Sequence, residues 1–205
     1  MRRLALTKRA LHEVDTAALN LTFMRRVYKK EGITIDLRTL RGRKIRASYF
    51  CEDDDCSVLL NKSLPPEARL FSLAHELKHH FADREIIQSG AIRCGDYNKN
   101  ELIEKATEVF AAEFIYPESE MRALAHQMEI SSRSCTPEQI VGFKRACPAR
   151  ISYTFVVKRF ERFKFIAKDA YKKVQFQKLE EQLHGPPIYK QEWYREYRAR
   201  KKQDL

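Results

Sequence analysis

Residues 65–85, PPEARLFSLAHELKHHFADRE, most strongly limit how this chain can fold, because they combine an apolar stripe with two histidines at helical spacing. The proline pair at the start suits the first turn of a helix. Apolar residues then recur on one side of that helix: Leu70, Leu73, Ala74, Leu77 and Phe81. Residues four apart lie on one helical face, so His75 and His79 can reach the same ion. The segment predicts a helix that packs on a core and presents both histidines in a cleft.

The five residues from His75 to His79 read His-Glu-Leu-Lys-His, which is the zincin pattern. Neutral imidazoles bind zinc well, and a helix holds two of them near one ion with little further loss of entropy. Glu76 follows the first histidine and can act as a base toward a water at the metal. We therefore predict His75 and His79 as metal ligands and Glu76 as the catalytic residue. The alternative is a solvated polar face on an ordinary amphipathic helix.

A catalytic zinc ion takes three protein ligands, so a third ligand is expected. The helix predicted over residues 101–116 offers four carboxylates: Glu101, Glu104, Glu108 and Glu113. The polar stretch over residues 88–100 returns this helix to the histidine helix. Glu104 and Glu108 share a face, and spacing alone does not choose between them.

Two further polar residues lie close to the histidine pair in sequence. His80 is about 100° round the helix from His79, so we expect a packing or surface role for it. Asp83 comes four residues after His79 and can accept the other N–H of that imidazole. The simpler expectation for Asp83 is an exposed acid at the end of the helix.

The remaining segments predict an α+β fold. Apolar residues at helical spacing over residues 4–31 end at Gly32, a helix stop. Three short segments rich in β-branched and aromatic residues predict a small, mostly antiparallel sheet: residues 33–37, 44–50 and 56–61. Beyond Pro117 the pattern is mostly helical, and two of its helices suit a helix-turn-helix. We expect three parts: a metallopeptidase domain over 1–130, a helical region over 131–184 and a basic aromatic tail over 185–205.

The net charge of +11 at pH 7 is uneven, with an acidic middle between two basic ends. Such asymmetry is expected when a site-bearing core is joined to segments that meet an anionic partner, although solubility alone also explains it. In the basic helix beginning near residue 150, four cations can face DNA phosphates: Arg150, Lys158, Arg159 and Arg162. The competing interpretation, that they solvate the outer side of a helical core, is equally consistent with the sequence.

Five cysteines without a secretory signal argue against a disulfide framework and predict reduced thiols in a cytoplasmic protein. Cys51 and Cys56 can face each other across a hairpin, but they lack the second pair that completes a zinc ribbon. No apolar run is long enough to span a bilayer, so we expect no membrane partner.

Two segments resemble the ImmA/IrrE metallo-endopeptidases. FSLAHELKHHF, residues 71–81, is similar to the family's Phe-Thr-Leu-Ala-His-Glu-Leu-Gly-His signature, and EKATEVFAAEFIYP, residues 104–117, to its Glu-x-Glu-Ala-Asn-x-Phe-Ala-Ala-x-Leu-Leu-Met-Pro segment. Alignment on the shared Phe-Ala-Ala and proline positions implies that Glu104 is the third zinc ligand. The chain departs from the family pattern at Lys78, where a small residue is usual, and at Ala106 to Glu108.

The resemblance implies a zincin-like domain, Zn²⁺ as cofactor, with manganese as the alternative ion, and peptide hydrolysis as the activity. It also implies a narrow protein substrate, a helix-turn-helix repressor or antitoxin-like partner, whose cleavage releases transcription of phage, mobile-element or stress-response genes. The competing interpretation is a DNA-associated regulator or toxin-antitoxin component with a structural or vestigial metal site. Lys78 and the basic C-terminal region favour that second interpretation, whereas the intact Glu76 favours the enzyme.

Overall fold

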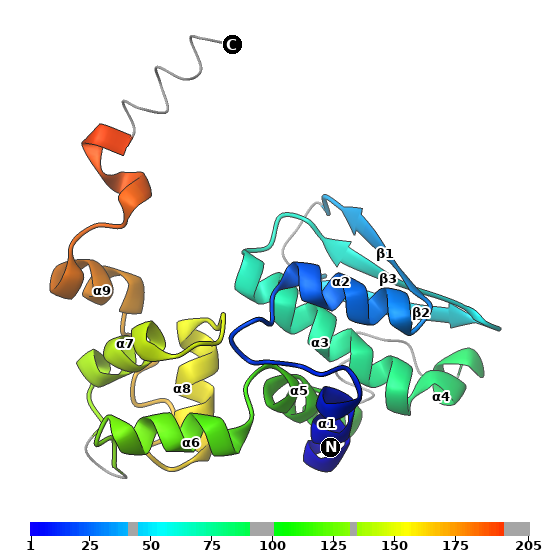
Figure 1. Cartoon of the computed structure of the whole chain (residues 1–205), viewed down its shortest axis with the longest axis horizontal. Helices are drawn as coiled ribbons and strands as arrows, with labels where there is room; N and C mark the ends of the chain where they lie inside the picture. Colours follow the sequence, from blue (N-terminus) through cyan, green and yellow to red (C-terminus); the bar gives the residue numbers. More distant parts are fainter. Residues whose placement is uncertain (41–44, 91–100, 132–134, 195–205) are drawn as a thin grey trace. The chain divides into compact units, whose positions relative to one another are not determined.

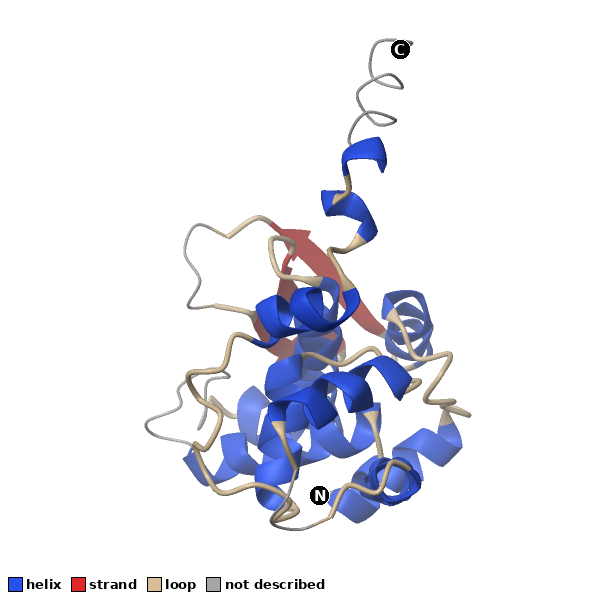
Figure 2. Cartoon of the chain, turned by 90° about the vertical axis from the view of Figure 1, so that its left-hand side faces the viewer, coloured by secondary structure: helices blue, strands red, loops and turns tan. Residues whose placement is uncertain are grey.

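The computed structural model has the α+β architecture expected from the sequence. Its strands, red in Figure 2, form one small sheet, and helices make up most of the rest. The structure describes residues 1–40, 45–90, 101–131 and 135–194. Within these ranges, no helix is both long enough and apolar enough to cross a bilayer.

Contacts between residues divide the chain into two compact units. The first comprises Met1–Leu124 and Cys147–Ser152, and the second comprises Ala125–Ala146 and Tyr153–Leu205. The sequence analysis expected a domain over 1–130, a helical region over 131–184 and a tail over 185–205. That division stays a prediction, because a grouping by contacts does not show which part folds alone.

The N-terminal segment forms two helices, so the single helix predicted over residues 4–31 is wrong. Helix α1 (Arg2–Leu11) ends before a turn, and helix α2 (Leu21–Lys30) starts after it. Asn20 caps α2, because its Oδ1 accepts hydrogen bonds from the backbone amides of Thr22 and Phe23 at 2.9 and 3.0 Å. These amides have no earlier helical carbonyl to bond, which is why asparagine favours a helix start.

The sheet has the strand order β1-β3-β2. Its strands are β1 (Ile33–Arg38), β2 (Ala47–Glu52) and β3 (Asp55–Asn61). β2 and β3 form an antiparallel hairpin, whereas β1 runs parallel to β3. The small sheet was predicted correctly, but the expected antiparallel pairing holds for only one of its two pairs of described strands. The reason is topological. β1 does not pair with β2, the next strand in the chain, but with the other edge of β3, and there it runs in the same direction as β3.

One face of the sheet is buried, and α2 and α3 (Pro66–Ala82) both contact the sheet (Figure 1). The strand register places these buried side chains on the same face: Ile33, Tyr49, Cys51, Cys56, Val58 and Leu60. The opposite side chain Phe50 is exposed. The sheet therefore supplies one wall of the core, and the histidine helix packs on that wall.

Helix α3 contacts the sheet and also packs against α5 (Glu101–Ile115). Pro66 occupies its first turn, as the sequence predicted. The predicted stripe is buried at Leu70, Leu73, Ala74 and Leu77. Phe81, the last residue of the stripe, has its ring centroid 6.1 Å from that of the fully buried Phe110 of α5. A short helix, α4 (Arg84–Gln88), follows α3 directly. Two helices distant in sequence are thus held side by side, which is what a shared site requires.

A disulfide joins Cys51 and Cys56 across the β2–β3 hairpin, where the two residues are paired in the strand register. The expectation that all the cysteines are reduced is therefore wrong for this pair. Cys135 and Cys147 carry free thiols, and Cys94 lies outside the described residues.

The second unit is helical in its described part. Helix α6 (Glu118–Gln127) begins in the first unit and ends in the second. Helix α7 (Pro137–Ala146) contacts both α8 (Tyr153–Arg162) and α9 (Phe176–His184), and a 3₁₀ turn follows at Ile188–Lys190. The Phe143 and Phe160 rings meet edge to face with their centroids 4.9 Å apart. A helix-turn-helix in this region stays a prediction.

The basic helix α8 presents fewer cations to solvent than the sequence suggested. Lys158 and Arg162 of α8 are exposed, as is Arg150, which precedes the helix and belongs to the first unit. Arg159 is buried with its guanidinium over the Phe163 ring, 4.9 Å from the centroid. A buried guanidinium cannot contact a phosphate backbone, so Arg159 belongs to the core of this unit. The last part of the predicted basic tail, residues 195–205, lies outside the described residues.

Candidate metal centre

The structure brings together three side chains that the sequence analysis predicted as ligands. His75 and His79 come from α3, one turn apart, and Glu104 comes from the first turn of α5. Nε2 of His75 lies 3.1 Å from Oε2 of Glu104, and Nε2 of His79 lies 3.8 Å from Oε1. One ligand atom from each residue falls within 4.8 Å of the others.

These separations fit a single metal ion. Two ligand atoms bound at about 2 Å to a tetrahedral zinc lie roughly 3.3 Å from each other, which is close to the two distances above. Nε2 of His79 is buried and makes no hydrogen bond to any described residue. A buried nitrogen without a donor is unfavourable unless it has another partner, and a cation between the three side chains supplies one.

Spacing left open the choice between Glu104 and Glu108, and burial and position in the structure favour Glu104. Glu104 is 2% exposed and faces the histidines, whereas Glu108 is half-buried and lies outside the cluster. The assignment of Glu104 as a ligand, first implied by resemblance, remains a prediction that this arrangement supports.

Glu76 directly follows His75 on α3 and is buried. A carboxylate at this position is close to the first histidine but is not part of the three-residue cluster. Both features suit the predicted role of a base toward a water at the centre, which stays a prediction.

Asp83 is not the exposed acid that the sequence analysis expected. It is 6% exposed, and its Oδ2 accepts a hydrogen bond from Nδ1 of His79 at 2.7 Å. The same oxygen accepts a bond from Nζ of Lys78 at 2.5 Å. Burial raises the pKa of Asp83, but the bonds from His79 and Lys78 outweigh it and hold that pKa below the ordinary value.

Lys78 is a residue beside the predicted centre whose pairing the sequence analysis did not foresee. The sequence analysis noted it only as a departure from the family pattern, and in the structure it is 2% exposed and paired with Asp83. The sequence feature that could have indicated this pairing is a lysine within an amphipathic helix that is followed, five residues later, by an acid. A lysine is almost never fully buried unless it is paired.

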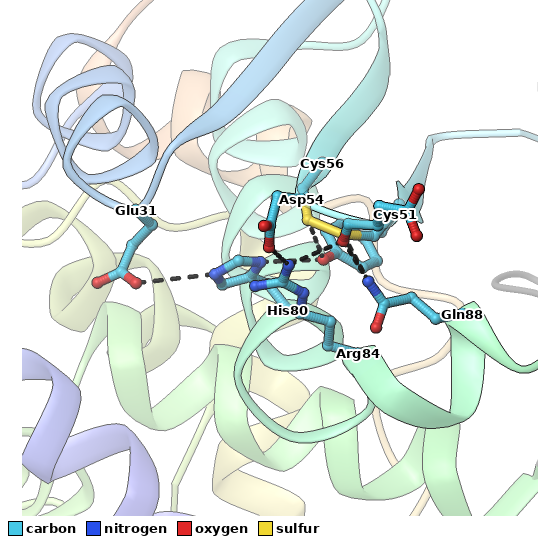
Figure 3. A network of polar contacts seen from close by, with 9 residues as sticks. Glu31, Cys51, Asp54, Cys56, His80, Arg84 and Gln88 are labelled. Atoms are coloured by element: carbon cyan, nitrogen blue, oxygen red, sulfur yellow. Dashed lines mark hydrogen bonds and ion pairs between the residues drawn. A yellow bond between two sulfur atoms is a disulfide. The ribbon is translucent and has the colours of Figure 1, made fainter.

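His80 makes contacts on the sheet side of α3, in line with the packing role expected for it. Figure 3 shows its ring beside Glu31 and the cysteine hairpin. Nδ1 of His80 lies 3.0 Å from the hydroxyl of Tyr49, and Nε2 lies 3.7 Å from Oε2 of Glu31. The Tyr49 hydroxyl is also 3.1 Å from Sγ of Cys56. Burial raises the pKa of Tyr49 to about 12, so its hydroxyl keeps its proton.

Part of the chain matches a known protein family. The family described as Peptidase_M78, IrrE N-terminal-like domain, matches residues 30–159. This range includes the sheet, the histidine helix and the helix that carries Glu104. No curated protein sequence matches the chain.

Proposed function

The chain belongs to the Peptidase_M78 family of IrrE N-terminal-like metallopeptidases, and from this premise we propose that it is a zinc-dependent endopeptidase that cleaves a specific protein. The observation that carries the proposal is the convergence of His75, His79 and Glu104 around one point. Two imidazoles and one carboxylate form a ligand set typical of catalytic zinc, which leaves a coordination position for solvent.

The residues divide the chemistry among them. When bound, zinc supplies a Lewis acid that polarises the scissile carbonyl and lowers the pKa of water toward neutrality. The imidazoles of His75 and His79 and the carboxylate of Glu104 would hold the ion. The carboxylate of Glu76 takes a proton from the attacking water and later passes it to the leaving amine. The buried surroundings of Glu76 favour this transfer, because they limit competing bulk water.

An extended segment of the substrate pairs with an edge of the sheet, a general way to hold a peptide for cleavage. β1 and β2 are the outer strands of the described sheet. β2 packs against α3, which carries the histidines. We place the substrate along β2 for that reason.

The substrate that the resemblance favours is a helix-turn-helix repressor or an antitoxin-like protein. Its cleavage releases transcription of phage, mobile-element or stress-response genes. The alternative is a DNA-associated regulator, favoured by the exposed Arg150, Lys158 and Arg162. The burial of Arg159 reduces the basic surface on which that alternative depends.

A comparison of wild type with Glu76→Gln tests the proposal. Zinc content is measured by mass spectrometry, and cleavage of a co-encoded repressor is followed on gels. We expect both proteins to hold one zinc ion, and only wild type to cleave. Glu108→Gln removes a nearby half-buried carboxylate of the same type and should cleave like wild type. Equal processing by wild type and Glu76→Gln, or specific DNA binding without any cleavage, would favour the regulator.

A further inference from the structure

We propose that the buried ion pair of Lys78 and Asp83 positions His79 as a metal ligand and sets the electrostatic potential that a metal ion meets there. The pair thereby determines how tightly the centre holds its ion. The inference rests on the proposed metal centre and adds two positioning residues to it. Neither residue touches the ion itself, because both act through the imidazole of His79.

The contacts on a single oxygen atom are the first support. Oδ2 of Asp83 accepts two hydrogen bonds, from Nδ1 of His79 at 2.7 Å and from Nζ of Lys78 at 2.5 Å. A carboxylate oxygen can only accept, so the proton of His79 lies on Nδ1 and the lone pair lies on Nε2. Nε2 is the nitrogen that faces Glu104 and makes no hydrogen bond among the described residues. Asp83 thus selects the form of the imidazole that binds a cation.

The backbone keeps Asp83 in place. Its amide donates to the carbonyl of His79 at 2.9 Å, and its own carbonyl accepts from the amide of Ile87 at 2.9 Å. Asp83 is therefore the junction between the end of α3 and the start of α4. Because the backbone of Asp83 is hydrogen-bonded through both its amide and its carbonyl, its carboxylate can hold the imidazole ring in one orientation, as a rigid ligand needs.

The charge of Lys78 gives the pair its second role. Lys78, His79 and Asp83 are all nearly excluded from water, so screening between their charges is weak. The carboxylate behind His79 attracts a cation at the centre, and the ammonium beside it opposes that attraction. Removing the ammonium leaves the attraction unopposed. Removing the carboxylate's charge leaves a lone buried cation that repels the metal.

These charges predict an order of affinities that a merely structural role does not. Zinc dissociation constants are measured by competition with a chelating indicator for wild type, Lys78→Met, Asp83→Asn and the double variant. We expect Asp83→Asn to bind zinc about 10-fold to 100-fold more weakly. Lys78→Met should bind at least as tightly as wild type, even though the metal-free protein becomes less stable. The double variant should lie between wild type and Asp83→Asn, because the repelling cation is gone and the amide oxygen still accepts from Nδ1.

The matched control is Arg9→Met, which also removes a buried cation but whose bonds go to Phe114 and Thr16, outside the centre. It should lose stability and keep the zinc affinity of wild type.

If each variant lost zinc affinity in proportion to its loss of stability, Lys78→Met included, the pair would be structural only. If Lys78→Met does not fold, the double variant still decides, because binding no tighter than Asp83→Asn overturns the inference. A wild type that binds no zinc refutes the proposed metal centre itself, whereas normal wild-type binding with unchanged variants refutes only the role of the pair.

Discussion

Arg9 donates a hydrogen bond from Nη1 to the backbone carbonyl oxygen of Phe114 at 2.5 Å, which joins α1 to α5. The guanidinium is buried, and its Nη2 also donates to Oγ1 of Thr16 at 2.8 Å. One side chain thereby links the first helix, the turn after it and the helix that carries Glu104. Burial lowers the pKa of Arg9, and nearby acids such as Glu120 oppose that shift.

Replacing Arg9 with methionine should lower the free energy of unfolding by about 2–4 kcal/mol. The change removes charge-assisted hydrogen bonds and leaves the Phe114 carbonyl without this donor. Urea denaturation followed by circular dichroism measures the loss. Arg3→Met on the same helix is the control, since Arg3 is exposed and its loss should cost less than about 0.5 kcal/mol. Equal stability of the two variants would show that the buried contacts of Arg9 contribute little.

Replacing Glu104 with glutamine should weaken zinc binding by at least about 100-fold, because an amide is a much poorer ligand than a carboxylate. Glu108→Gln, one turn later on α5, should bind like wild type, since Glu108 lies outside the cluster. Isothermal titration with zinc measures both constants. A loss confined to Glu108→Gln would move the third ligand to that residue.

The stability of the protein should fall as the pH drops from 7 to 5, and His12 should account for part of the fall. Burial lowers the pKa of His12, although the Glu31 carboxylate opposes the shift. Below the ordinary histidine value of about 6.5 the unfolded chain therefore binds more protons than the folded chain, and stability is lost as pH falls through the folded pKa. Urea titrations in chelator at pH 7, 6 and 5 measure this slope. The His12→Gln variant should show a shallower slope, and an unchanged slope would exclude His12 as a source.

Replacing both Cys51 and Cys56 with serine should lower the free energy of unfolding by about 2 kcal/mol, since the crosslink closes only a short loop. Thermal unfolding with and without reductant measures the effect in wild type, and the double serine variant should not respond to reductant. Zinc affinity should stay unchanged, because neither cysteine belongs to the ligand cluster. A large loss of affinity on reduction would show that the hairpin supports the centre more directly.

Local pattern was enough to predict the histidine helix and part of its site. The apolar stripe and the proline start of α3 are features of consecutive residues, so the helix and the shared face of His75 and His79 follow from spacing alone. Glu104 required more, because two carboxylates one turn apart fit the same spacing and only the packing of α5 on α3 separates them. Family resemblance favoured Glu104, the packing of the two helices supports it, and its role as a ligand stays a prediction.

Other features were missed, or depend on contacts between residues distant in sequence. α1 ends at Leu11 and Asn20 caps α2, a local signal that the apolar spacing over residues 4–31 concealed. The parallel pairing of β1 depends on which strand it meets, a question of long-range topology. The partnership of Lys78 with Asp83 depends on burial at the junction of two helices. The sequence analysis expected Asp83 to be exposed and made no prediction for the partner of Lys78.

The order β1-β3-β2 also has a consequence for synthesis on the ribosome. β3 is the central strand, yet it follows both of its neighbours in the chain, so the nascent β1 has no partner until residue 61 has been made. The hairpin of β2 and β3 is local and closes first, and β1 joins it afterwards. The histidine helix follows β3 in the chain, and Glu104 follows later still. A nascent chain that ends before residue 104 therefore contains all three described strands but lacks the carboxylate predicted as the third ligand.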